Sequence, residues 1–80
     1  MYIHIGGDRM IRSAELIAIF DISIEQSSKI SSQYMQYNKE HNRVETAGEE
    51  EVKSIVVTRD QIFYSPISSS TLKKRLYQII

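Results

Sequence analysis

The sequence predicts one small α+β domain, residues 1–80, with a mainly antiparallel sheet and two helices. Three observations support this fold class. Short apolar and β-branched runs occur near both ends of the chain, a long segment with helical spacing lies between them, and a serine-rich helix start follows the only proline. The strands are expected at 2–5, 10–12, 16–20, 44–46, 54–58 and 62–65, and the helices at about 24–41 and 69–79.

The first three strands come from residues 1–21. Residues 2–5 alternate aromatic and β-branched side chains, and Gly6-Gly7-Asp8 is typical of a turn. Residues 16–20 form a nearly continuous apolar run, which suits a buried central strand. One helical turn over Ser13–Leu16 is the alternative at the start of this run.

The first helix is predicted from the spacing of apolar residues after Asp21, with Asp21 or Ser23 as its N-cap. Ile30, Tyr34, Tyr37 and His41 recur at helical intervals, with Met35 beside them, so this stripe is expected to face the core. We expect the two tyrosines to cover the edge of the core with their hydroxyls in water. Stacking on bases or anchoring an interface is the alternative.

The second half contains an acidic loop and a hairpin. Glu49-Glu50-Glu51 is expected to be a solvated loop, because three adjacent carboxylates are not buried together; a surface metal site and a complement to a basic neighbour are the alternatives. Arg59-Asp60 predicts the hairpin turn between strands 54–58 and 62–65, which Pro66 ends. Ser69 or Ser70 is expected to cap the last helix, which buries Leu72, Leu76 and Ile79 or Ile80.

The length and composition of the chain favour self-association. A chain of 80 residues buries only about 60–65% of its unfolded surface, and it has no cysteine for a disulfide or a thiolate metal site. His4 and His41 lack the spacing of metal ligands, and no motif for nucleophilic or acid–base catalysis is present, so neither a cofactor nor an enzyme is predicted. No signal segment or membrane-spanning run is evident, so we expect a cytoplasmic protein without a membrane partner.

The net charge is zero, but the charges are unevenly distributed. Residues 31–52 carry two basic and five acidic groups, whereas residues 53–80 carry five basic groups and one acidic group. These opposite segments permit contact between copies. The basic helix is either a phosphate-binding surface or simply a solvated face.

The segments KSIVVTRDQIFYSPISSSTLKKR, MYIHIG and SAELIAIFD resemble the Rem family of bacterial extracellular-matrix regulators, in particular its RemB-like branch, the companion of RemA. The resemblance extends from Met1 to Arg75. It implies a small α+β protein that assembles into a ring. In RemA-like members the ring binds DNA on its outer, basic surface and activates matrix-biosynthesis promoters. Repeating a basic patch around a ring multiplies the total number of phosphate contacts, even when each copy makes only a few.

This sequence departs from the RemA-like pattern at the DNA-contacting loop. Acidic residues 49–51 stand where RemA-like members carry adjacent arginines, and Glu15 replaces another basic residue. We therefore expect DNA contacts from the remaining cations, with Arg9 and Arg12 as further candidates: Lys53, Arg59, Lys73, Lys74 and Arg75. The apolar faces of Tyr2–Ile5 and the terminal helix are expected to form the interfaces of the homo-oligomer.

Two functions follow from this comparison. The first is a ring-forming, DNA-associated regulator of matrix genes whose partners are further copies and duplex DNA. The second is an interaction protein that does not bind DNA. It would use Glu49, Glu50 and Glu51 to engage a basic partner such as a RemA-like ring.

Overall fold

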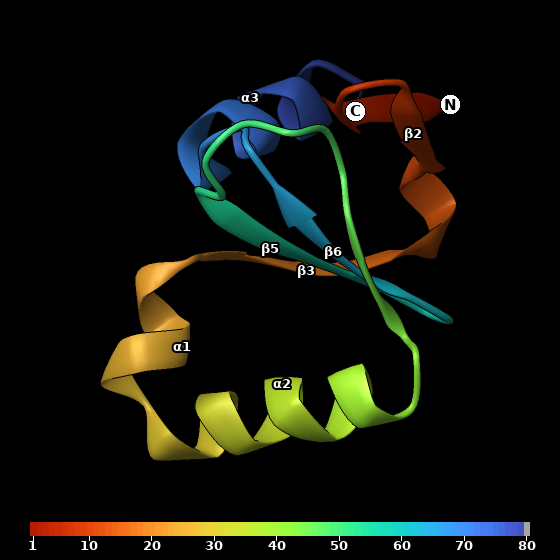
Figure 1. The fold of residues 1–80 in the computed structure, drawn as a ribbon. Coiled ribbons are helices and arrows are strands. Elements are labelled where there is room, and N and C mark those ends of the chain that lie inside the picture. Colours follow the sequence, from red (N-terminus) through yellow and green to blue (C-terminus); the bar gives the residue numbers. More distant parts are fainter. Residues whose placement is uncertain (80) are drawn as a thin grey trace.

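The computed structural model describes residues 1–79, without the side chain of Ile79. The predicted burial of Ile79 or Ile80 lies outside the described side chains. Figure 1 shows the order of the elements along the chain. The elements are β1 (Tyr2–Gly6), β2 (Arg9–Arg12), a 3₁₀ turn (Ser13–Glu15), β3 (Leu16–Asp21), α1 (Ser23–Ser27), α2 (Lys29–Glu40), β4 (Val44–Thr46), β5 (Ser54–Thr58), β6 (Ile62–Ser65) and α3 (Ser69–Ile79).

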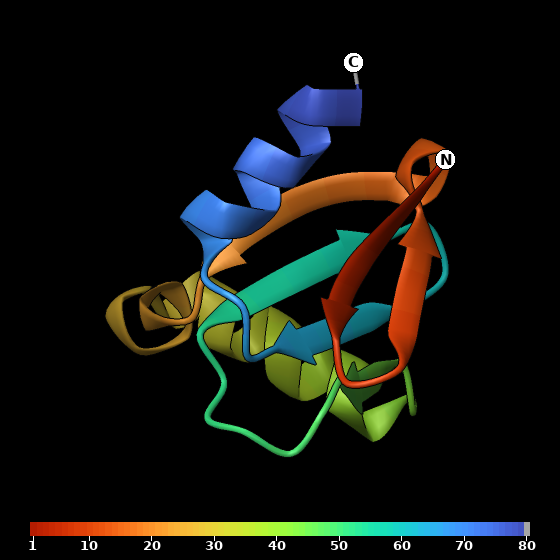
Figure 2. The same cartoon turned by 90° about the horizontal axis from the view of Figure 1, so that it is seen from above.

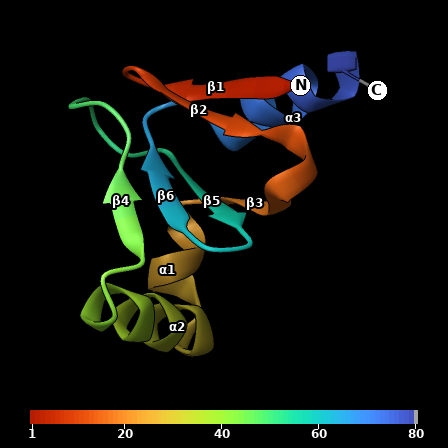
Figure 3. The same cartoon turned by 90° about the vertical axis from the view of Figure 1, so that its right-hand side faces the viewer.

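The strands form two sheets instead of the single predicted one. β1 and β2 make a separate antiparallel hairpin, and the other four strands follow the order β3-β5-β6-β4. The pairs β3–β5 and β5–β6 are antiparallel, but β4 lies parallel to β6. Residues 47–53 carry the chain from β4 past β6 to β5, and this crossover lets β4 and β6 run in the same direction (Figure 3).

The four-stranded sheet is the middle layer of the molecule. Helix α2 packs against one face, and α3 with the β1–β2 hairpin covers the other (Figures 1 and 2). All five residues of β5 are buried. Because side chains alternate along a strand, Val56 belongs to the core under α3, whereas Ile55 and Val57 belong to the core under α2.

The predicted helix 24–41 is divided into α1 and α2 at Ser28. The backbone of Ser28 is extended (φ −124°, ψ 119°), and the Ser28 Oγ accepts a hydrogen bond from the amide of Ser31 at 3.2 Å. Ser28 therefore caps α2, which a serine does better than it supports a helix interior. The 3₁₀ turn at 13–15 agrees with the helical alternative for that segment.

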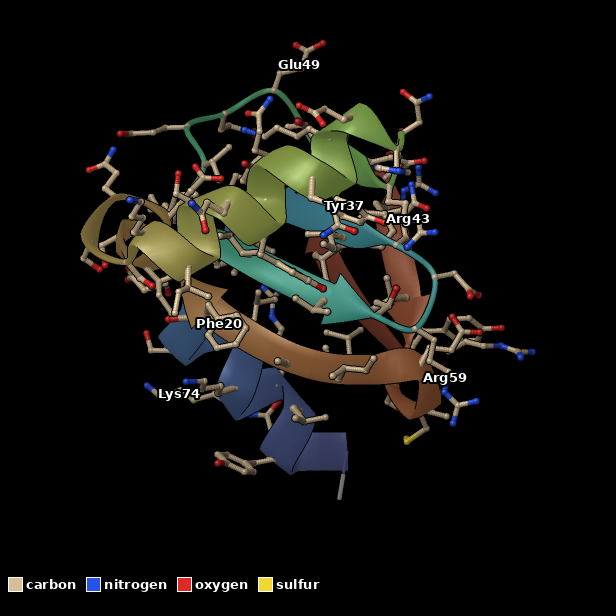
Figure 4. All side chains as sticks on the ribbon, turned by 90° about the horizontal axis from the view of Figure 1, so that it is seen from below. Phe20, Tyr37, Arg43, Glu49, Arg59 and Lys74 are labelled. Carbon is tan, nitrogen blue, oxygen red and sulfur yellow. The ribbon has the colours of Figure 1, made fainter. Side chains whose placement is uncertain are left out.

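The predicted core stripe of α2 is wrong. Ile30, Tyr34 and Tyr37 are 80%, 49% and 53% exposed, whereas Met35 and Asn38 are buried. Asn38 is tolerated there because its amide donates to the carbonyl of Tyr34 at 2.8 Å. The helix is thus rotated so that Ile30 and Tyr37 face solvent (Figure 4), whereas Tyr34 borders the core beside Met35.

Candidate nucleic-acid interface

The five cations predicted to contact DNA do not form one continuous site. Lys53 lines a hollow near the start of β5 together with Glu50 and Glu51. Arg59 occupies the turn between β5 and β6, and the remaining three lie on α3. Figure 4 shows that Arg59 and Lys74 are well separated. These three places would therefore contact DNA separately and not as one surface.

Several basic side chains have structural partners. Arg75 is half-buried, and its Nη1 donates to the carbonyl of His4 at 3.0 Å, which ties α3 to β1. Arg9 forms an ion pair with Glu45, and its guanidinium lies 5.3 Å from the centre of the Phe63 ring. Because phosphate would have to compete with these contacts, Arg75 and Arg9 are weaker candidates than cations that have no partner.

Arg59 belongs to a polar hollow of about 300 Å³ at one end of the sheet, which we call the arginine hollow. It contains a second arginine, Arg43, from the connection between α2 and β4. Among the described residues, ion pairs occur only for Arg9–Glu45 and Lys39–Glu25, so neither Arg43 nor Arg59 has an acidic partner. The hollow is lined by Tyr34, Asn38, Arg43, Thr58, Arg59, Asp60, Gln61 and Ile62.

The backbone on both sides of the arginine hollow is held by short-range hydrogen bonds. Asn42 adopts a left-handed conformation (φ 56°), which ends the helical segment. The amide of Arg43 then donates to the carbonyl of Asn38 at 3.0 Å, and the carbonyl of Arg43 accepts from the amide of Ile62 at 2.7 Å. Arg43 is therefore anchored to both α2 and β6.

On the opposite side, Thr58 closes the hairpin turn. Its Oγ1 donates to the carbonyl of Gln61 at 2.7 Å, and this leaves Arg59 and Asp60 exposed at the tip. Two guanidinium groups against one carboxylate give the hollow a net charge of +1. Guanidinium N–H groups suit a phosphate or carboxylate oxygen, and two of them line this hollow.

Arg43 was not predicted as a DNA-contacting residue. The only local signal was a basic residue two positions after the predicted helix end. Arg43 approaches the β5–β6 turn because β4 pairs in parallel with β6, with Val44 opposite Ile62. The direction of that pairing was not predicted, so the neighbour of Arg59 could not be predicted either.

The acidic loop, residues 47–53, is fastened at both ends. The amide of Ala47 donates to the carbonyl of Tyr64, and the amide of Lys53 donates to the carbonyl of Ser65, each at 2.8 Å. Glu49, Glu50 and Glu51 are exposed between these anchors, as the solvated-loop interpretation expected. Within residues 1–79, no cluster of three or more metal-ligating side chains occurs. The loop therefore carries three exposed carboxylates, with one cation, Lys53, lining the same hollow as Glu50 and Glu51.

The comparisons with known proteins agree with the family resemblance. Residues 2–76 match the family model described as "RemA-like: Extracellular matrix regulatory protein A-like". The chain belongs to this family. It is also 41% identical over 75 residues to Extracellular matrix regulatory protein B of Bacillus subtilis (strain 168), which covers 94% of this chain and 89% of the relative. The predicted RemA-like family and its RemB-like branch are confirmed.

In this member of the RemA-like family, the arginine hollow and the acidic loop lie on different parts of the surface (Figure 4). None of the helices in the described part of the chain is long and apolar enough to cross a membrane.

Proposed function

We propose that this RemA-like protein is a cytoplasmic, DNA-associated regulator of extracellular-matrix genes that acts as a homo-oligomeric ring. The name of its Bacillus subtilis relative supports a role in matrix regulation. The observation that carries DNA association is the arginine hollow, where Arg43 and Arg59 have no acidic partner among the described residues. The proposed role requires neither catalysis nor a cofactor.

In this proposal, phosphate oxygens accept hydrogen bonds from Arg43 and Arg59. Lys53, Lys73 and Lys74 add longer-range attraction, and Arg75 contributes less because it is bound to His4. One copy with zero net charge offers few contacts. A ring repeats the arginine hollow. Once one copy is bound, each further copy that reaches the duplex adds its own phosphate contacts without a second loss of translational and rotational entropy.

The proposal is tested by fluorescence anisotropy with duplex DNA at about 50 and 200 mM salt, on protein whose assembly mass has been measured. The wild type should bind, and its affinity should fall steeply with salt. Arg43→Glu with Arg59→Glu should abolish binding while the assembly mass stays unchanged. Within this pair, each single change should weaken binding and lower the salt dependence.

Lys29→Glu is the matched control for Arg59→Glu, because it makes the same charge change at an exposed position outside the arginine hollow. It should leave DNA binding close to that of the wild type. Wild-type binding by the double arginine variant, or no binding by the wild type at low salt, would contradict the proposal.

A second candidate function rests on the acidic loop. Glu49, Glu50 and Glu51 are exposed and form no ion pair within residues 1–79, so they suit a basic protein partner such as a RemA-like ring. This alternative expects no DNA binding by the wild type. It also expects that reversing the three charges to lysine abolishes a complex with the purified partner, and an unchanged complex would exclude this site.

A further inference from the structure

The arginine hollow is lined by buried residues as well as by its two exposed arginines. Asn38, Thr58 and Ile62 line it and are 5%, 7% and 3% exposed. Arg43 and Arg59 are exposed, and Figure 4 shows both at the same end of the sheet. The volume of about 300 Å³ lies at the lower end of the range for small-molecule sites, roughly 300–1,000 Å³. The hollow therefore has room for a small organic ligand, of which a phosphate group would fill only a part.

Two amide side chains in the hollow have hydrogen-bonding groups to spare. The Asn38 Nδ2 donates to the carbonyl of Tyr34, whereas the Asn38 Oδ1 has no donor within residues 1–79 and is not sealed from solvent. The backbone of Gln61 is bonded to Thr58, but the Gln61 side chain forms no hydrogen bond with the described part of the chain. A buried amide oxygen is normally satisfied by protein, water or a ligand. Both amides are thus available to a ligand that offers N–H or O–H groups.

Tyr34 adds an aromatic ring to this site. It lies on α2, it is 49% exposed, and it lines both the arginine hollow and a small apolar hollow beside Met35. One part of the ring therefore contacts the core, and another part remains accessible from the arginine hollow. Exposed aromatic rings of this kind stack with nucleobases, because every base has a flat π face.

Duplex DNA would use only part of this arrangement. Its bases are paired and stacked inside the helix, so a duplex phosphate would engage Arg43 and Arg59 and leave Tyr34 and Asn38 without a partner. A phosphodiester also carries a single negative charge. A phosphate monoester carries about −1.5 to −2 near neutral pH and accepts more hydrogen bonds, so it matches two guanidinium groups better. These groups together favour a small ligand with a terminal phosphate and a flat, polar ring.

We propose that the arginine hollow binds a nucleoside monophosphate, and that this ligand competes there with DNA. The phosphate accepts hydrogen bonds from Arg43 and Arg59. The base stacks on Tyr34, and the Asn38 Oδ1 accepts from an N–H group on the edge of the base. Asp60, the one carboxylate of the hollow, accepts from a ribose hydroxyl. This inference rests on the proposed function, because it gives the DNA-contacting guanidinium groups a second, regulatory ligand.

Isothermal titration calorimetry tests the site, with adenosine monophosphate as the probe and protein whose assembly mass has been measured. Adenosine lacks the phosphate and ribose phosphate lacks the base, so each should bind at least about tenfold more weakly than adenosine monophosphate. No binding of adenosine monophosphate at millimolar concentration would overturn the inference. Equal affinity for ribose phosphate would also overturn it, because the hollow would then bind a phosphate alone.

Two variants separate the base contact from the phosphate contact. Tyr34→Leu keeps an apolar side chain against the core but removes the ring, so the preference for adenosine monophosphate over ribose phosphate should fall close to one. Arg59→Gln should weaken both ligands by about tenfold and leave that preference unchanged. A loss of fold alone would not produce these opposite patterns, and circular dichroism checks that both variants are folded.

Tyr37→Leu is the matched control for Tyr34→Leu, because Tyr37 lies on the same helix and is 53% exposed but does not line the hollow. It should bind adenosine monophosphate like the wild type. An unchanged ligand preference in Tyr34→Leu, or the same loss in both tyrosine variants, would overturn the placement of the base.

Competition with DNA separates this inference from the proposed function. Saturating adenosine monophosphate should weaken duplex binding in the anisotropy assay more than the same concentration of ribose phosphate, which has the same charge. If adenosine monophosphate binds but wild-type protein does not bind DNA, the nucleotide site stands and DNA association is wrong. If wild-type protein binds DNA but not the nucleotide, DNA association stands and this inference is wrong. If both bind and the nucleotide leaves DNA binding unchanged, the competition is wrong and the DNA contacts lie outside the hollow.

Discussion

Leu72 provides the strictest test of how α3 is held on the sheet. Its side chain is fully buried in the core between α3 and the strands, with Ile5 and Val56 as members of the same cluster. Leu72→Ala removes the side chain beyond Cβ and leaves a cavity under the helix. Fully buried leucines truncated in this way destabilise by about 3–5 kcal/mol.

That loss is large for a chain of this size. Typical stabilities of roughly 0.05–0.15 kcal/mol per residue give about 4–12 kcal/mol for 80 residues. Leu72→Ala should therefore remove a quarter or more of the total and increase hydrogen exchange in α3 first. Urea unfolding at one fixed protein concentration measures it. With a slope of about 1–2 kcal/mol/M for a small domain, the midpoint should fall by more than about 1 M.

Ile30→Ala is the control for this measurement, because Ile30 is 80% exposed on α2. It should change the free energy of unfolding by no more than about 0.5 kcal/mol. A cost below about 1 kcal/mol for Leu72→Ala, with an unchanged urea slope, would refute the argument. It would mean that α3 does not depend on this contact, and the position of Lys73 and Lys74 beside β3 would need another cause.

Four further predictions concern the contact between Tyr64 and Glu25 of α1, the turn after β1 and the end of α2. Tyr64→Phe removes the hydrogen bond from the Tyr64 hydroxyl to Glu25 and should cost about 1 kcal/mol in urea unfolding; no measurable loss would show that the bond contributes nothing. Burial, and then the hydrogen bond to Glu25, raises the pKa of Tyr64 above 10.0. The contribution of the neutral Tyr64 hydroxyl to the free energy of unfolding should therefore be complete below pH 10.0 and lost as the pH rises through the raised pKa. A pH titration of unfolding in which Tyr64→Phe shows the same alkaline loss would contradict this. Gly6→Ala should destabilise by more than about 1 kcal/mol in thermal unfolding, because φ is +130° and the added Cβ would lie 2.5 Å from Cδ of Pro66. Asn42→Gly should be tolerated within about 0.5 kcal/mol because φ is 56°, and a larger loss would point to a contact of the Asn42 side chain.

The local elements were well predicted from the sequence. Every strand was placed within one residue at each end, and the bounds of α3 match those predicted. The reason is that strands and helices impose their own periods on apolar residues, and Pro66 marks the end of β6. The cap of α3 is Ser68, whose Oγ accepts from the amide of Thr71 at 3.3 Å, and not Ser69 or Ser70 as predicted. The division of the helix at Ser28 was not predicted, because the helical spacing of apolar residues continues across it. Serine is nevertheless a favourable N-cap residue, and Ser28 caps α2.

The sequence by itself determined the class of the fold and the separation of acidic and basic segments along the chain. Only the tertiary structure decided which groups meet. It placed Arg43 and Arg59 on one hollow, turned Ile30 and Tyr37 of α2 outward, and left β3 as an open apolar edge. It also bound Arg75 to His4. Local periodicity defines an element and its apolar side, because both depend on neighbours a few residues away. The direction in which β4 pairs, and the rotation of α2 on the sheet, depend on how distant elements share one core.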